Sequence, residues 1–244
     1  MSFEICVDSV ESAIAAQSGG ADRVELCDNL FEGGTTPSFG STAMARDLLN
    51  IKLHVIIRPR GGDFLYSDTE FEIMKRDIEA ARKLGVDGVV IGLLNDDGNV
   101  DKERTKELIT LARPMSVTFH RAFDVCRDPY EALETLIELG IDRVLTSGQK
   151  ANAVEGVDLI GKLVEKAADR IIIMACGGLN ETNIADVISA TGVKELHFTA
   201  FETVESAMQY RNDAVAMGSE EAGSEYLRNV TSAEKIKRII AAAQ

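Results

Sequence analysis

Short runs of apolar, mostly β-branched residues alternate along the chain with longer segments in which apolar residues recur at helical spacing. Val10 and Ile14 mark one such segment, and Leu133, Leu136 and Ile137 mark another. The short runs predict eight strands, at residues 3–7, 22–27, 52–58, 88–92, 116–120, 143–147, 171–175 and 195–199. Alternation of strand and helix predicts a parallel sheet, and eight such units predict an α/β fold closed into a (β/α)8 TIM barrel.

Turn residues and chain length support this fold. Gly20, Gly85 and Gly140 each stand shortly before a predicted strand, where a glycine commonly ends a helix. The 244 residues match one barrel, and no linker divides them, so we predict a single domain over residues 1–244. Residues 200–230 predict a long loop, either a lid or an interface segment, before a last helix at 231–243. A doubly wound open sheet is the alternative, but no G-x-G-x-x-G motif follows the first strand.

The predicted strands alternate between apolar residues, which should face the helices, and polar residues, which should face the barrel interior. The inward set contains all three histidines of the chain, two glutamates, an arginine and two cysteines: Glu4, Cys6, Glu25, Cys27, His54, Arg58, His120 and His197. Burying unpaired charged groups costs several kcal/mol each, so such a cluster favours a functional site. The alternative is a structural polar network that closes the barrel.

These residue types suit acid–base chemistry on a small anionic substrate. Glu25 or Glu4 is the candidate general base, and His120 the candidate acid or base. Arg58 and Arg60 are the candidate anion clamp, and His54 and His197 are further candidate ligand-binding residues. No lysine falls on an inward strand position, and no G-x-S-x-G or H-E-x-x-H motif occurs, which disfavours Schiff-base, serine hydrolase and zincin chemistry.

Loops at the same end of the strands supply further candidates for ligand binding. Asp63 and Arg121 follow the third and fifth strands, and Ser147 ends the sixth. Gly177 and Gly178 follow the seventh strand, where many TIM barrels bind phosphate through backbone N–H groups. The alternatives are a local ion pair between Arg121 and Asp124 and a simple glycine turn.

Cys6 and Cys27 lie at matching inward positions on neighbouring strands, which run about 4.8 Å apart in a sheet. Two close thiols select Cu(I), and nearby histidine and carboxylate would extend the choice to zinc or Cu(II). The alternative is that both cysteines pack as small hydrophobic residues. Cys126 and Cys176 fall at strand ends without a defined partner.

Charge and cysteine usage limit the partners and the compartment. Forty acidic residues against 26 basic ones give a net charge of -14, which disfavours nucleic acid and anionic membrane surfaces. The N-terminal residues MSFEICVD do not resemble a signal peptide, and no apolar run approaches the roughly 18 residues of a membrane span. Four irregularly spaced cysteines indicate reduced thiols, so we expect a cytoplasmic protein.

Several long motifs resemble the CutC family, which is associated with cytosolic copper homeostasis: ICVDSVESA from Ile5, GGADRVELC from Gly19, EGGTTPS from Glu32, IRPRGGDF from Ile57, TFHRAFD from Thr118 and LTSGQ from Leu145. The resemblance implies a TIM barrel, a cytoplasmic location, a homo-oligomer and Cu(I) binding by Cys6 and Cys27. The chain departs from the family pattern at Cys176 and at Phe198-Thr199-Ala200. A copper-binding protein and a barrel enzyme of unassigned reaction both remain open.

Overall fold

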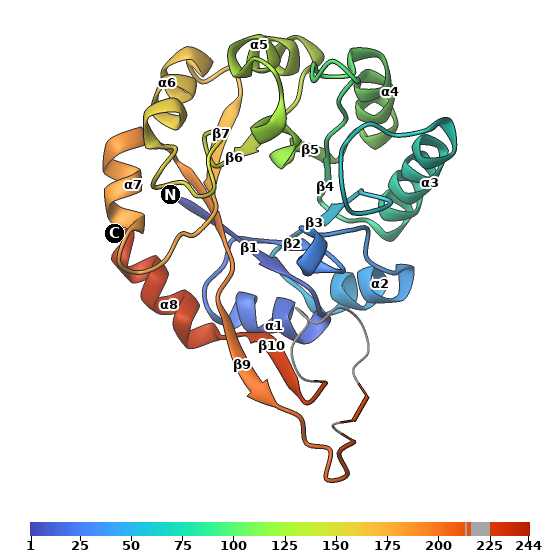
Figure 1. Ribbon diagram of the computed structural model, residues 1–244, viewed down its shortest axis with the longest axis vertical. Coiled ribbons are helices and arrows are strands. Elements are labelled where there is room, and N and C mark those ends of the chain that lie inside the picture. The colour runs from blue at the N-terminus through green and yellow to red at the C-terminus, as the bar shows by residue number, and fades with distance from the viewer. Residues whose placement is uncertain (213, 216–224) are drawn as a thin grey trace.

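The computed structural model describes residues 1–212, 214–215 and 225–244, and its strands close into a parallel barrel in chain order (Figure 1). The strands are β1 (Ser2–Val7), β2 (Arg23–Leu26), β3 (Lys52–Ile56), β4 (Gly88–Ile91), β5 (Ser116–Phe119), β6 (Arg143–Thr146), β7 (Ile172–Cys176) and β8 (Glu195–Phe198). The predicted (β/α)8 TIM barrel is confirmed, and each predicted strand overlaps an observed one.

Helices follow the strands and surround the barrel (Figure 1). They are α1 (Val10–Ser18), α2 (Phe39–Leu48), α3 (Asp68–Leu84), α4 (Lys102–Ala112), α5 (Pro129–Leu139), α6 (Val157–Ala167), α7 (Ile184–Thr191) and α8 (Ala233–Ala242), with short 3-10 helices η1 (Leu30–Glu32) and η2 (Arg121–Val125). The sequence sets their ends locally. Ser67 and Glu70 form a capping box at the start of α3, and Gly85 ends it at φ 73°.

The main apolar core lies between the barrel wall and the helices. Ile5, Val24 and Leu53 project outward from successive strands into this core and are fully buried. The barrel interior is different, because its apolar groups form two small clusters among polar side chains. One contains Cys6, Cys27, Ile56 and Val90, and the other contains Leu145, Met174 and Cys176. The inward and outward faces therefore alternate as the strand pattern predicts.

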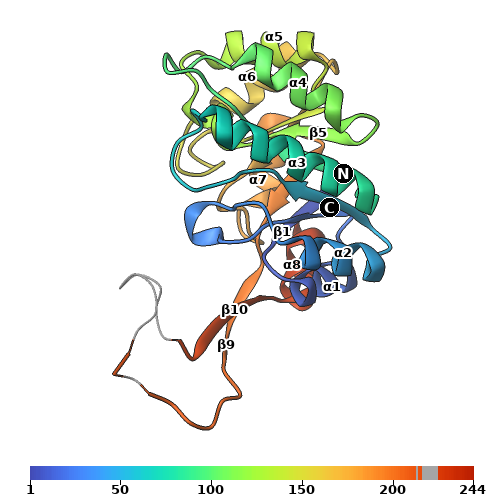
Figure 2. The same cartoon turned by 90° about the vertical axis from the view of Figure 1, so that its right-hand side faces the viewer.

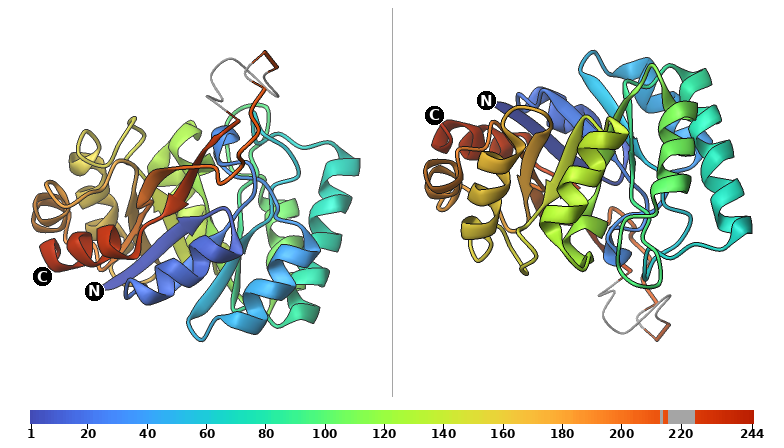
Figure 3. Two further views of the ribbon diagram at one scale, coloured as in Figure 1. Left: turned by 90° about the horizontal axis from the view of Figure 1, so that it is seen from below. Right: turned by 90° about the horizontal axis from the view of Figure 1, so that it is seen from above.

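The segment after β8 corrects the sequence prediction. Residues 200–230 were expected to form a loop, but strands β9 (Phe201–Glu205) and β10 (Leu227–Thr231) pair as a separate antiparallel sheet. This pair projects beyond the barrel as an arm (Figures 2 and 3). The last helix is shorter than predicted, because Thr231 ends β10 and Ser232 caps α8. Within the described residues, no helix has both the length and the apolar character needed to cross a bilayer.

Candidate functional site

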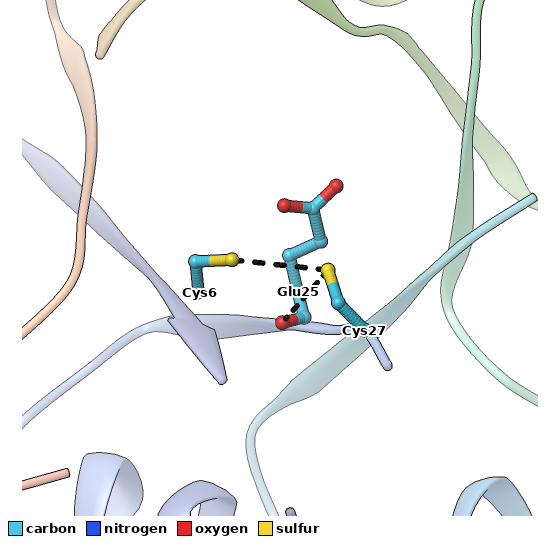
Figure 4. Close-up of side chains that lie close together, drawn as sticks. All are labelled: Cys6, Glu25 and Cys27. Atoms are coloured by element: carbon cyan, nitrogen blue, oxygen red, sulfur yellow. Dashed lines mark hydrogen bonds between the residues drawn. The ribbon is translucent and has the colours of Figure 1, made fainter. Parts of the chain in front are cut away.

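Two thiols, one carboxyl group and one imidazole meet in the barrel interior. We call the four residues that carry them the thiol pocket: Cys6, Glu25, Cys27 and His197. The strand register brings them together, because Cys6 lies opposite Glu25 in the β1–β2 pair. The Sγ atoms of Cys6 and Cys27 are 3.7 Å apart, and the two thiols face each other beside the Glu25 side chain (Figure 4). Both cysteines are buried and are not in a disulfide, so the predicted pairing of these positions is realised as a thiol contact.

His197 enters the pocket from β8, on the other side of β1. Its Nε2 atom lies 3.7 Å from Oε2 of Glu25, and its Nδ1 atom lies 2.7 Å from Oε1 of Glu4. Burial opposes a charge on this imidazole, but the hydrogen bonds with Cys6 and Glu4 outweigh burial and place the pKa of His197 well above its usual value. His197 therefore links the thiol pocket to Glu4.

Within the thiol pocket, the Glu25 carboxyl has the fewest interactions to offset the cost of its burial. Its Oε1 atom is buried and has no hydrogen-bond partner. Burial, followed by the negative charge of Cys6, raises the pKa of Glu25 well above its usual value, although His197 works in the opposite direction. This carboxyl can hold a proton, accept a hydrogen bond or bind a cation.

The two thiols differ in acidity although they are neighbours. The hydrogen bond from Cys27 lowers the pKa of Cys6 to about 6 against the opposing effect of burial, and His197 adds to this stabilisation. The same hydrogen bond raises the pKa of Cys27 well above its usual value. Cys6 is therefore the thiol that becomes a thiolate first.

Glu4 belongs to a network of ion pairs near the beginnings of the strands. Of this network, only Glu4 was identified from the sequence. Arg23 pairs with Glu4 and donates to Glu195 at 2.7 Å, and Arg143 donates to Glu195 at 3.1 Å. Burial would raise the pKa of Glu4, but Arg23 and the hydrogen bond with His197 together lower it. Glu4 is thus a paired carboxylate that orients His197.

Arg23, Arg143 and Glu195 were missed, although the strand alternation carried the signal. Arg23 lies two residues before Glu25, and Glu195 lies two residues before His197, so both share the inward face. Because they stand at the beginnings of strands, where charged residues are usually exposed, the sequence pattern does not indicate that Arg23 and Arg143 are buried and Glu195 is partly buried. They show that part of the inward polar set does form the structural network considered as the alternative.

His54 and His120 lie inside the barrel but outside the thiol pocket. His54 is 3.7 Å from Glu4 and leaves its Nδ1 atom without a hydrogen bond. His120 accepts a hydrogen bond at Nδ1 from the backbone N–H of Ala122, packs against Phe64 and leaves its Nε2 atom without a partner. Burial lowers the pKa of each imidazole to about 3, so both are neutral.

The arginines predicted to clamp an anion are engaged with the protein. Arg58 donates through Nη1 to the carbonyls of Glu32 and Gly34 and through Nη2 to that of Gly62, while its Nε atom has no partner. Arg60 pairs with Glu70 at 2.6 Å and with Asp63 at 3.0 Å. Arg58 is buried and Arg60 is partly exposed, so only the latter is open to a ligand from solvent.

The remaining loop candidates form a separate group at the barrel mouth. Arg121 pairs with Asp124 at 2.7 Å, and the Arg121 guanidinium also donates to the hydroxyl of Ser147. The ion pair considered as the alternative for Arg121 is therefore present. Gly177 and Gly178 both have positive φ, of 92° and 71°, as expected for a tight turn.

Cys126 and Cys176 lie apart from the thiol pair. Cys126 contacts the side chain of Gln149, and burial raises its pKa to about 12. Cys176 packs with Leu145 and Met174, and burial raises its pKa well above the usual value. Neither cysteine belongs to a group of potential metal ligands among the described residues.

Fold and site together define a TIM-barrel protein with a buried thiol and carboxylate pocket. The CutC family model matches residues 1–241, and the chain belongs to the CutC family. A family protein CutC from Bacteroides fragilis is 55% identical over 239 residues, covering 98% of this chain and 95% of that protein. The copper homeostasis protein cutC homolog of Homo sapiens is 50% identical over 242 residues, covering 99% and 89%.

Solved structures agree with this assignment. A crystal structure of CutC from Streptococcus agalactiae matches with a TM-score of 0.78 and 36% identity, covering 81% of this chain and 98% of that one. An N-(5'-phosphoribosyl)anthranilate isomerase from Pyrococcus furiosus matches with a TM-score of 0.60 at 13% identity, covering 100% and 98%. The second likeness supports the barrel fold alone.

Proposed function

We propose that this protein binds Cu(I) as its cargo through Cys6 and Cys27. The observation that carries the proposal is the buried contact between their Sγ atoms, 3.7 Å apart, on neighbouring strands of the barrel. Thiolates are soft ligands that favour Cu(I) over harder ions. The lowered pKa of Cys6 makes one thiolate available near neutral pH.

Family membership supports copper as the metal, since the human relative is named for copper homeostasis. The fit of the donors is chemical as well as spatial, because the pocket holds two soft sulfur donors in contact with each other. We further propose that the protein works in the cytoplasm, where reducing conditions keep such cysteines as thiols.

The first test measures the Cu(I) affinity of the reduced protein against a competing Cu(I) chelator. Replacing both ligands in a Cys6→Ser, Cys27→Ser variant should weaken binding by about 100-fold or more, because serine hydroxyls are hard, neutral donors. A Cys126→Ser variant is the matched control and should bind like the unchanged chain. Equal affinity in the double variant and the control would refute the proposal.

A second candidate function is an enzyme that acts on a small anionic substrate. Two buried, unpartnered atoms favour it, Oε1 of Glu25 and Nε2 of His120, because such atoms are common where a ligand is missing. Glu25 would serve as general base, and His120, neutral and with Nδ1 accepting from Ala122, would donate a hydrogen bond from Nε2 to the substrate. Arg60 and Arg121 offer partly exposed guanidiniums, and Asp63, Ser147, Gly177 and Gly178 would line the mouth.

This candidate is tested by screening small phosphorylated and carboxylated compounds for turnover. Any activity should fall by about 10²- to 10⁴-fold in a Glu25→Gln, His120→Asn variant, since that is the usual contribution of acid–base groups. The pH profile of the unchanged enzyme should show two ionisations. Activity that survives both substitutions would assign the chemistry to other residues.

A further inference from the structure

A short motif occurs before each even-numbered strand of the barrel. A glycine with positive φ follows the preceding helix, an apolar residue comes next, and the third residue leads into the strand. The motif reads Gly20-Ala21-Asp22, Gly85-Val86-Asp87, Gly140-Ile141-Asp142 and Gly192-Val193-Lys194. The third residue is therefore an aspartate before β2, β4 and β6 and a lysine before β8.

The three aspartates make the same contact. Each carboxylate accepts a hydrogen bond from the backbone N–H of the second residue of the preceding strand. The contacts are Phe3 to Asp22 at 2.8 Å, Leu53 to Asp87 at 2.8 Å and Val117 to Asp142 at 2.7 Å. Asp87 also pairs with Arg46, and Asp142 also pairs with Arg113. In these two units a backbone donor and a cation converge on one carboxylate.

The fourth unit has the donors without the carboxylate. Its equivalent strand residue is Ile173, because Met174 pairs with Glu195 where β7 meets β8, just as Glu4 pairs with Arg23 where β1 meets β2. Ile173 is buried, and no side chain among the described residues accepts a hydrogen bond from its N–H. A backbone donor and the Lys194 ammonium thus stand where the other units hold an anion.

A cavity of about 360 Å³ lies at this position, between the last turn of α6 and the beginnings of β7 and β8. Ile173 and Lys194 are among its lining residues. Apolar side chains form much of the remaining wall: Val164, Ala167, Ile171 and Val193. The volume falls within the range of about 300 to 1,000 Å³ that is typical of small-molecule sites.

Two carboxylates line the same cavity, and each has another partner. Asp169 pairs with Lys194 at 3.1 Å, but their side chains are 90% and 80% exposed, so this pair contributes little. Glu195 is bound through its Oε2 atom by Arg23 and Arg143. Because an ammonium group carries three donors, Lys194 keeps donors for an anion that enters the cavity.

We propose that this cavity binds a small monocarboxylate with an apolar body. Its carboxylate accepts a hydrogen bond from the N–H of Ile173 and pairs with Lys194, in the place that an aspartate side chain occupies in the other three units. Its apolar body packs against the aliphatic wall. The site lies at the N-terminal ends of the strands and uses no residue of the thiol pocket, so it is independent of the proposed function.

The test uses 2-naphthoate as the probe and 2-naphthamide as its neutral isostere, with the full chain. Calorimetric titration should show that naphthoate saturates at one equivalent. Naphthamide should bind at least about tenfold more weakly, because hydrogen bonds to an ionised acceptor are stronger. Naphthoate should also move the amide NMR signal of Ile173 downfield. No saturable binding, equal affinities for the two compounds, or an Ile173 signal that does not move would each overturn the proposal.

A Lys194→Asp variant restores the residue of the other three units. Its carboxylate should accept from the Ile173 N–H, so the variant should unfold at the same or a higher temperature, while naphthoate affinity falls by about 100-fold or more through charge repulsion. Lys106→Asp, at an exposed position of α4, makes the same change of charge and should bind like the unchanged chain.

A second variant keeps the test open if Lys194→Asp does not fold. Lys194→Gln keeps much of the side-chain length and loses the charge, so naphthoate affinity should still fall by about tenfold. Naphthoate affinity that stays unchanged in a folded Lys194 variant would overturn the proposal.

Discussion

His120 shows how a single buried imidazole can be placed by its neighbours. A glycine at 92 makes room for the ring, because a Cβ atom there would lie 2.3 Å from its Cε1 atom. Phe64 packs on the ring, and Ala122 fixes Nδ1 as an acceptor. Strand alternation predicted that His120 points inward. It could not predict that His120 lies outside the thiol pocket, because its neighbours Phe64 and Ala122 belong to a loop and to η2 and not to the strands.

His120 should make stability depend on pH in a defined direction. Burial lowers its folded-state pKa from 6.5 to about 3, so between these values the unfolded chain binds a proton that the folded chain does not. The resulting stabilisation is complete above pH 6.5 and is lost as the pH falls, at about 1.4 kcal/mol per pH unit. Urea unfolding from pH 6.5 to 4.5 measures the slope.

A His120→Asn variant supplies the comparison, because its amide oxygen can still accept the hydrogen bond of Ala122 but does not titrate. Its free energy of unfolding should fall less steeply with decreasing pH, and the two slopes should differ by about 1.4 kcal/mol per pH unit, the value for one bound proton. Parallel slopes in the two chains would mean that His120 has the same pKa in the folded and unfolded states.

At the scale of elements, the loop that contains η1 covers the thiol pocket. Leu30 packs on the cluster around Cys6 and Cys27. Gly34 passes so close that a Cβ atom would lie 3.3 Å from Sγ of Cys27, and its φ of 93° favours glycine. Arg58 ties this loop down through the carbonyls of Glu32 and Gly34. The sequence revealed the charge of Arg58 but not these acceptors, which come from a loop 24 and 26 residues away.

Replacing Arg58 should therefore open the thiol pocket. An Arg58→Met variant keeps much of the side-chain volume but loses hydrogen bonds from a charged donor, each worth about 1.5 to 3 kcal/mol. Alkylation of Cys6 and Cys27 by a small thiol reagent should accelerate by at least about tenfold, measured by mass spectrometry of the labelled peptides.

Two comparisons separate local opening from general loosening. Arg60→Met removes a neighbouring guanidinium that does not bind this loop, so it should leave the rates near those of the unchanged chain. Cys126 serves as a reporter within the same molecule. If its alkylation accelerates as much as that of Cys27, the substitution has destabilised the whole barrel, and Arg58 does not hold the loop specifically.

At the scale of the molecule, the barrel was predictable and the arm was not. Each βα unit carries its own period and turn residues, so local patterns were enough to give eight strands in order. The arm pairs Thr203 with Asn229, which are distant in sequence, and its exposed strands carry charged residues that hide the alternation. The predicted single domain remains a prediction, which one cooperative unfolding transition would support.

The composition of the thiol pocket was predictable in the same limited sense. The alternation of side chains along each strand predicted which residues face inward. Which of these residues touch one another depends on the stagger between neighbouring strands. Cys6 lies opposite Glu25 rather than Cys27, so the thiols meet diagonally, and His197 joins from the strand that closes the barrel. Closure brings the first and last strands together, and no local pattern reports which of their residues will touch.

The arm carries the last prediction, which concerns the homo-oligomer implied by the family resemblance. An isolated two-stranded sheet is marginally stable in water, yet this one projects from the barrel (Figure 2). Leu227 on β10 is 49% exposed, and Met208 and Tyr210, in the segment of the arm that follows β9, are 59% and 78% exposed. Burying such side chains against a second copy contributes about 1.5 to 3 kcal/mol each. We therefore expect light scattering to give a mass above that of one chain.

A Leu227→Ser, Tyr210→Ser variant should shift the mass toward the monomer, while Phe39→Ser, on the exposed side of α2, should leave it unchanged. The contrast matters because both variants remove exposed apolar surface, and only one removes it from the arm. An oligomer that persists in the arm variant and dissociates in the Phe39 variant would place the contact on the barrel, and the arm would then need another partner to account for its apolar side chains.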